Sequence, residues 1–296
     1  MTADRLMVLD APSLYFRAFF GVPESVTAPD GTPINAVRGL VDMTAQLVRK
    51  YRPQRLVACM DADWRPAFRV AALPAYKAHR VGPGGGDQAP EALNVQVPII
   101  EQVLAAVGIP CVGVAGFEAD DVIGTLAEAH GGPVDVVTGD RDLFQLVRDD
   151  KPVRVLYTAR GVARLDVVDE AAITEKYGVP GRSYGEFAML RGDPSDGLPG
   201  VPGVGEKTAA ALVTKYGTAA EAAQHEPKVA RHADYVAAAE VVVRVVTDVP
   251  LPVYDDLLPT APADPEGLVA LCDRWGLDSA LNRLGAALAW QHGGNG

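Results

Sequence analysis

Residues 116–127 read GFEADDVIGTLA and place three carboxylates, those of Glu118, Asp120 and Asp121, within four residues. The apolar residues that follow recur at helical spacing, so we expect a helix whose first turn carries the acids. Taken alone, the pattern has an ordinary explanation, because acidic residues at a helix start cap the helix and complement its dipole. It becomes informative because further acidic residues recur at the ends of predicted strands.

Short apolar runs that are typical of buried strands recur along the first half of the chain. The predicted strands are Arg5–Leu9, Arg55–Met60, Cys111–Val114, Val134–Val137, Val153–Tyr157 and Val162–Val167. Amphipathic helices are expected between them at Ile34–Tyr51 and Glu91–Val107. This alternation predicts an α/β fold with a mostly parallel central sheet flanked by helices.

Strands stop and helices take over from Asp169 onward, which places a boundary between about residues 168 and 182. We therefore predict an α/β core over residues 1–175 and a helical subdomain over residues 176–296.

Composition describes a globular chain of 296 residues, 48% of them hydrophobic, with a net charge of −11. No apolar run reaches the length of a membrane span and the N-terminus does not resemble a signal peptide, so we expect a cytoplasmic protein. The three cysteines, Cys59, Cys111 and Cys272, are widely spaced in apolar surroundings and fit reduced core residues. The negative charge argues against a nucleic-acid partner, unless many of the acids bind cations.

Nine carboxylates fall at strand ends or in the turns beside them: Asp10, Asp61, Glu118, Asp120, Asp121, Asp140, Asp142, Asp193 and Asp196. Parallel strands end along one edge, so these groups would crowd together and need cations. Oxygen ligands without His or Cys favour hard divalent metals, Mg²⁺ or Mn²⁺, and two such ions suit in-line displacement at phosphorus. Setting the nine aside takes the net charge from −11 to −2, so a polyanionic substrate is no longer excluded.

Residues 198–216 carry a second signal. Gly203, Val204 and Gly205 precede an Ala-rich helix that ends at Tyr216, a pattern typical of a hairpin between two helices. The backbone N–H groups of such a hairpin take a phosphate without reading a base, although a plain helix–turn–helix packing corner is the alternative. Together with the carboxylates, the hairpin indicates the phosphorus of a nucleic-acid backbone.

Several motifs carry a resemblance over nearly the whole chain: Asp10 with Ser13–Leu14 and Arg17–Phe20, Asp61 with Phe68–Arg69 and Tyr76–Arg80, Gly116–Ala127, Thr138–Leu146 and Leu190–Thr208. With them the chain resembles the bacterial 5′ nuclease family, meaning flap endonucleases and the 5′-exonuclease domain of DNA polymerase I. The resemblance implies a PIN-like nuclease core and a helix-hairpin-helix, or helix-three-turn-helix, motif in the C-terminal subdomain. It also implies a stand-alone member without the polymerase region.

The same resemblance implies roles for particular residues. One metal is expected at Asp10, Asp61, Glu118 and Asp120 and a second at Asp140, Asp142 and Asp196, with Asp121 and Asp193 as outer ligands through water. Lys77 and Arg80 are expected to steer the scissile phosphate at the base of an arch over residues 81–107, which would thread or clamp a single-stranded 5′ end. The expected DNA contacts are Arg17, Arg69, Tyr76 stacking on a base, and Gly203, Val204, Gly205, Lys207 and Thr208 at the hairpin.

The implied activity is divalent-metal-dependent 5′-3′ exonuclease and flap endonuclease cleavage in replication and repair. The implied partners are DNA with a free 5′ end, flap, nick or gap, RNA primer–DNA hybrids as a further class, and a functional link to a DNA polymerase and ligase. In this family a monovalent cation such as K⁺ often sits on the hairpin carbonyls. A monomer is expected.

Three departures from the family pattern stand out. Ala11-Pro12 replaces a usual Gly-Asn, Gly197 replaces a common Asn, and the arch carries Gly84–Gly86 with little basic charge. None removes a ligand.

Two other functions stay open from sequence. A small-molecule phosphohydrolase would need only the strand-end carboxylates, and a structure-specific DNA-binding protein would need no catalysis. The aromatic stretch Leu14–Phe20 is interpreted as core packing. Neutralising Glu118 or Asp120 is expected to cost cleavage while leaving stability intact or improved.

Overall fold

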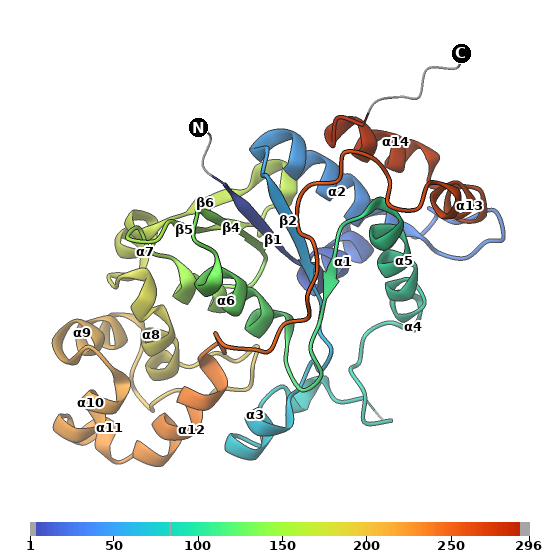
Figure 1. Cartoon of the computed structure of the whole chain (residues 1–296). Coiled ribbons are helices and arrows are strands. Elements are labelled where there is room, and N and C mark those ends of the chain that lie inside the picture. The colour runs from blue at the N-terminus through green and yellow to red at the C-terminus, as the bar shows by residue number, and fades with distance from the viewer. Residues whose placement is uncertain (1–3, 83, 291–296) are drawn as a thin grey trace.

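The computed structural model describes residues 4–82 and 84–290 and is built around one six-stranded sheet (Figure 1). The strand order is β3-β2-β1-β4-β5-β6, and only the pairing of β6 with β5 is antiparallel. The strands are β1 (Leu6–Asp10), β2 (Arg55–Cys59), β3 (Cys111–Val112), β4 (Val134–Thr138), β5 (Val153–Tyr157) and β6 (Asp166–Val168). The prediction of a mostly parallel central sheet is confirmed.

Both faces of the sheet are covered, which explains the continuous apolar runs of its strands. In β1, Leu6 and Val8 belong to one hydrophobic core, whereas Met7 and Leu9 belong to a second core across the sheet. The first core contains α6 (Ala119–Ala129), α8 (Tyr184–Arg191) and α12 (Ala233–Val243). The second contains α1 (Ala11–Gly21), α2 (Asn35–Tyr51) and α5 (Val97–Val107).

Eight further helices complete the described part of the chain. They are α3 (Ala67–Ala72), α4 (Glu91–Asn94), α7 (Glu170–Tyr177), α9 (Glu206–Tyr216), α10 (Ala219–His225), α11 (Pro227–Ala230), α13 (Pro265–Trp275) and α14 (Asp278–Ala287). Single 3₁₀ turns occur at Ala78–Arg80, Asp142–Leu146, Val162–Arg164 and Gly181–Ser183. In the part of the chain described, no helix combines the length and apolar character needed to cross a bilayer.

The last helices correct the predicted extent of the helical subdomain. The chain returns to the sheet after Val249, where Leu56 N donates to Asp256 O at 2.8 Å. Buried side chains of α14, such as Leu281 and Leu284, then join the core that contains α2, and Figure 1 shows α13 and α14 beside α2 and α5. Because the apolar side chains of α14 are buried in the core that contains α2, residues 176–296 are not one helical unit.

The predicted arch over residues 81–107 is also too long. Ile99, Ile100, Val103 and Leu104 of α5 are buried in the core. The single helix expected over residues 91–107 is interrupted before α5, because Pro98 lacks an N–H and is tolerated only in a first turn. The exposed loop near the groove described below is confined to residues 84–90 and their neighbours.

Candidate active site

The chain continues from β1 to β2 on one side and from β4 to β5 on the other, so the carboxyl ends of the neighbouring strands β1 and β4 form a topological switch point, where open α/β sheets place ligands. A groove of about 1290 Å³ opens there. We call it the carboxylate groove. The predicted site residues that line it are Asp10, Arg17, Asp61, Lys77, Arg80, Glu118, Asp120, Asp140 and Asp193.

Asp10 is fixed between the two central strands. Its Oδ1 accepts from Ser13 N at 3.1 Å and caps α1, while its Oδ2 accepts from Thr138 Oγ1 at 2.5 Å. Burial raises the pKa of Asp10 to about 7, and the neighbouring carboxylates of Asp61 and Asp140 add to the rise against the two hydrogen bonds. Asp10 is therefore a buried acid whose charge calls for a cation.

The turn after β4 holds two further acids. Asp142 N donates to Asp140 Oδ1 at 2.9 Å, which sets the two side chains close to each other. Burial raises the pKa of Asp142 well above its usual value, and Asp140 and Asp196 raise it further. Within the described part of the chain, Asp142 Oδ1 is buried and has no hydrogen-bond partner.

A loop over residues 193–198 brings the last two acids. Burial raises the pKa of Asp196 to about 6, and Asp193 accepts from Ser195 N at 2.9 Å. Gly197, one of the departures from the family pattern, has φ +78° and lies so close to Ala75 O that a Cβ would come within 2.4 Å of it. A glycine here lets the loop lie directly against the segment that carries Lys77.

Asp61 and Asp120 complete the set on the β2 side. Asp61 Oδ1 accepts from Ala119 N at 2.8 Å, so Asp61 also helps to hold the start of α6. Burial raises the pKa of Asp120 well above its usual value, with further increases caused by Asp140 and Asp10. The side chains of Asp10, Asp120 and Asp140 thus repel one another across the groove.

These acids offer the carboxylate oxygens that hard divalent cations prefer as ligands. No group of three or more His, Cys, Asp or Glu side chains in residues 4–82 and 84–290 forms a ready-made metal site. However, the acids raise one another's pKa values, and Asp142 presents a buried oxygen without a hydrogen-bond donor. Carboxylate oxygens that repel one another are stabilised by a bound divalent cation.

Glu118 and Asp121 are engaged in a different way. Arg69, which is 2% exposed, donates to Glu118 at 2.5 Å and to both oxygens of Asp121 at 2.6 and 2.8 Å. Asp121 also accepts from the backbone N of Glu118 and of Val246, and the two acids form a capping box at the start of α6. The capping interpretation is confirmed.

This geometry corrects the prediction that Asp121 is an outer metal ligand, because both its oxygens are taken up inside the protein and it is fully buried. Because Glu118 is the partner of a buried arginine, we now expect its neutralisation to lower stability rather than to leave it intact or improve it. Glu118 does line the groove.

The predicted DNA contacts of Arg69 and Tyr76 are wrong, because both side chains are buried. Arg69 is buried, and its Nε donates to Val242 O at 3.1 Å. Tyr76 is 2% exposed, and its hydroxyl donates to Glu118 at 2.7 Å. Neither side chain offers a surface to DNA, and the Tyr76 ring cannot stack on a base from its place in the core.

Lys77 and Arg80 supply positive charge in the groove. Lys77 takes a left-handed conformation with φ 47°, and its ammonium bonds to Glu118. Arg80 lies 3.7 Å from Asp196 and donates to Ser195 O at 3.3 Å. Both cations are held beside the acids, where a phosphate that enters the groove would meet them.

Part of the groove is aromatic, which was not predicted from the sequence. Phe16, Phe20 and Trp64 line it together with Arg160, and Phe20 is 73% exposed. The stretch Leu14–Phe20 was expected to be core, which holds for Leu14 and Phe19 but not for Phe20. The spacing of the two residues in the sequence could have predicted this aromatic surface, since Phe16 and Phe20 lie four residues apart and therefore on one side of α1.

The hairpin at residues 201–205 is a tight turn. Val204 N donates to Val201 O at 2.9 Å, Gly203 has φ +73°, and Gly205 precedes α9. Gly203, Gly205, Lys207 and Thr208 are exposed, as DNA contacts require. The prediction that Val204 contacts DNA is wrong, because Val204 is buried and its N–H is used within the turn.

An ammonium contacts one carbonyl of the hairpin, since Lys228 Nζ donates to Gly203 O at 2.5 Å.

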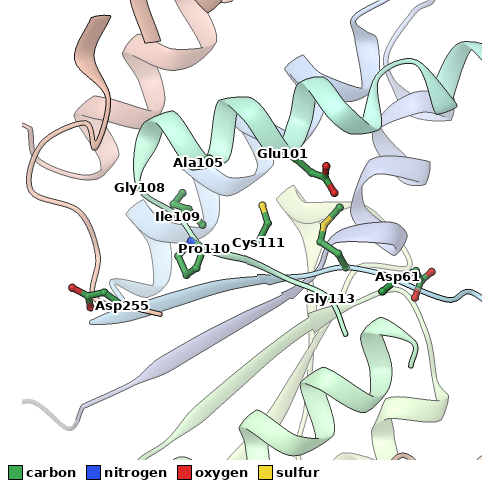
Figure 2. A pocket seen from close by; sticks show the side chains of 11 residues that line it. Asp61, Glu101, Ala105, Gly108, Ile109, Pro110, Cys111, Gly113 and Asp255 are labelled. Carbon is green, nitrogen blue, oxygen red and sulfur yellow. The ribbon is translucent and has the colours of Figure 1, made fainter. Parts of the chain in front are cut away.

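A second cavity, of about 640 Å³, shares Asp61 with the groove. Figure 2 shows Glu101 of α5 and Cys111 of β3 in its wall, with Asp255 at its other end. Burial raises the pKa of the Cys111 thiol to about 12, so the thiol stays protonated and is a poor nucleophile near neutral pH.

Comparison with known proteins follows the two parts of the chain. A family model described as "5′-3′ exonuclease, N-terminal resolvase-like domain" matches residues 5–178, and one described as "5′-3′ exonuclease, C-terminal SAM fold" matches residues 179–266. A 5′-3′ exonuclease of Streptomyces coelicolor is 57% identical, with 94% of this chain and 98% of that protein covered. A 5′-3′ exonuclease of Mycobacterium tuberculosis is 49% identical, with 96% and 97% covered.

Longer proteins match as well. DNA polymerase I of Mycobacterium leprae is 40% identical, and the match covers 97% of this chain but only 32% of the polymerase. Among solved structures, a T5 protein co-crystallised with metal ions has a TM-score of 0.63 at 17% identity, with 96% of this chain and 98% of that chain covered. The T5 flap endonuclease in a complex with DNA and metal ions has a TM-score of 0.61 at 17% identity, with the same coverage. At this identity the structures support the fold.

Proposed function

The chain belongs to the 5′-3′ exonuclease family, and from that premise we propose that it hydrolyses DNA phosphodiesters near a free 5′ end with divalent cations bound in the carboxylate groove. The observation that carries the proposal is the convergence of acids from the ends of β1, β2 and β4 and from the start of α6, where Asp10, Asp61, Asp120 and Asp140 line one groove. Relatives that are named exonucleases over their whole length support it.

We propose Mg²⁺ or Mn²⁺ as the cations. Asp10, Asp61 and Asp120 would hold one ion from the β2 side, with Glu118 at its edge. Asp140, Asp142 and Asp196 would hold a second from the β4 side, with Asp193 as an outer ligand. Such ions, when bound, would supply a nucleophilic hydroxide near neutral pH and offset charge on the reacting phosphate.

The protein's own residues bind and orient the substrate. Lys77 and Arg80 line the groove beside the acids and would hold the non-bridging oxygens of the scissile phosphate. Arg17 and the exposed Phe20 lie along the same groove, where an unpaired 5′ segment would be accommodated. The exposed backbone of Gly203 and Gly205 would take a phosphate of the duplex.

The biological setting follows from that substrate class. We propose DNA with a 5′ flap, nick or gap as the substrate, RNA primer–DNA hybrids as a further one, and action beside a DNA polymerase and a ligase. A matching region within DNA polymerase I of relatives supports the link to replication. We also propose that the protein acts as a monomer in the cytoplasm.

A panel of 5′-labelled flap, nick and overhang DNAs tests the function, alongside a generic phosphomonoester. We expect Mg²⁺- or Mn²⁺-dependent release of short labelled products from the DNAs, no release in EDTA, and little turnover of the phosphomonoester. Preferred turnover of the phosphomonoester would instead identify a small-molecule phosphohydrolase. DNA binding that is sensitive to salt, without cleavage in either metal, would identify a non-catalytic binding protein.

A further inference from the structure

The hairpin turn carries an exposed glycine, Gly203, whose carbonyl oxygen is not used within the turn. Val201, Pro202, Gly203 and Val204 form a four-residue turn closed by the bond from Val204 N to Val201 O. Pro at the second position and Gly with φ +73° at the third are the residues that a type II turn demands. The exposed Gly203 carbonyl oxygen would repel a phosphate that approaches the neighbouring N–H groups, unless a positive charge covers it.

Lys228 covers that oxygen from another element. It lies on α11, where Val229 is fully buried and anchors the backbone. Its ammonium donates to Gly203 O at 2.5 Å. A Cβ on Gly203 would come within 2.8 Å of the same nitrogen, so the glycine leaves the room that the lysine uses.

An ammonium group has three N–H donors and no acceptor. One donor serves Gly203 O, and the side chain is exposed, so two donors remain for a ligand. A second charge lies nearby in sequence on α9, where Lys207 is exposed in the first turn. Two exposed lysines, Lys207 and Lys228, thus add positive charge to the hairpin and the helix that follows it.

We propose that Lys228 acts as a tethered cation of the hairpin: it neutralises the Gly203 carbonyl and presents its free donors to a phosphate of the DNA duplex. The inference rests on the proposed function, because it needs DNA as the ligand. It replaces the monovalent ion that the family resemblance implies, so DNA binding by this chain should not depend on which monovalent cation is present.

The test compares two salts at equal concentration. The dissociation constant for a nicked duplex is measured in EDTA, which prevents cleavage, with either KCl or tetramethylammonium chloride, whose bulky cation cannot bind carbonyls. For the wild-type protein we expect the two values to agree within about twofold, because ionic strength alone then sets the electrostatic contribution.

The Lys228→Met variant should bind about tenfold more weakly in tetramethylammonium chloride, the loss of about one strong charged contact. It should recover part of that loss in KCl, because K⁺ can then reach the vacated carbonyl. The matched control is Lys215→Met, which removes the same charge from the last turn of α9, where the ammonium lies over Tyr216. It should match the wild type in both salts.

Two results would overturn the inference: wild-type binding that is markedly tighter in KCl, or an equal loss for Lys228→Met in both salts. In either case wild-type DNA binding and metal-dependent cleavage would remain, so the proposed function would stand. Absence of DNA binding by the wild type in both salts would overturn the proposed function as well.

Discussion

Cleavage of a 5′-flap DNA by the double variant Asp140→Asn with Asp142→Asn is expected to fall by about a thousandfold or more, since it removes two acids that we assign to one bound cation. The amide introduced by Asp140→Asn keeps an oxygen that can accept from the N–H of residue 142. The amide introduced by Asp142→Asn would lie near the Asp196 carboxylate and the amide oxygen at position 140, because the side chains at both positions neighbour Asp142. The fold should therefore be retained.

The measurement is the single-turnover cleavage rate in saturating Mg²⁺, with unfolding by urea as the check on folding. A matched control is Asp149→Asn with Asp150→Asn, which makes the same change of charge at two exposed positions before β5. The control should cleave at the wild-type rate. Retention of Mg²⁺-dependent cleavage by a folded Asp140→Asn, Asp142→Asn variant would refute the assignment of the second cation.

The second large effect concerns stability. Replacement of Arg69 by Met is expected to lower the free energy of unfolding by about 3–5 kcal/mol, the cost of leaving buried charges without their partner. Asp121, which is fully buried, would keep only backbone donors. Arg69 also bonds to Val242 O and Arg244 O, so its loss would loosen the packing of α12 against α3.

Urea denaturation measures this loss. The control is Arg55→Met, because Arg55 is partly exposed and its ion pairs with Asp4 and Asp256 should contribute no more than about 1 kcal/mol. Adding Asp121→Asn to Arg69→Met should restore part of the loss by removing the unpaired charge. A loss below about 1 kcal/mol for Arg69→Met alone would show that the buried ion pairs of Arg69 with Glu118 and Asp121 do not stabilise the fold.

The central sheet and the location of the site could be predicted from sequence because both follow from local pattern. Apolar runs identify strands, parallel strands end along one edge, and an acid directly after a strand must lie at that edge. Asp10, Asp61 and Asp140 follow this rule, and the groove lies where it predicts.

The partners of a side chain could not be predicted in this way. Arg69 meets Glu118 and Asp121 across about fifty residues of chain, and nothing in the spacing of the acids distinguishes a metal ligand from the partner of a buried arginine. Tyr76 is similar, because a tyrosine beside a lysine is equally compatible with a stacking surface and with the core.

The packing partners of whole helices could not be predicted either, as the return of the C-terminal helices to the sheet shows. The apolar stripe of α14 shows that one face is buried, but not that α2 buries it. Such a choice depends on long-range packing, which periodicity does not encode.

The most direct test of divalent cations in the carboxylate groove is anomalous diffraction from a crystal of the wild-type protein soaked in Mn²⁺. We expect peaks bounded by Asp10 and Asp120 on one side and by Asp140 and Asp142 on the other, with no peak between Arg69 and Asp121. A fully soaked crystal without a peak at these acids would show that the carboxylate groove does not bind divalent cations.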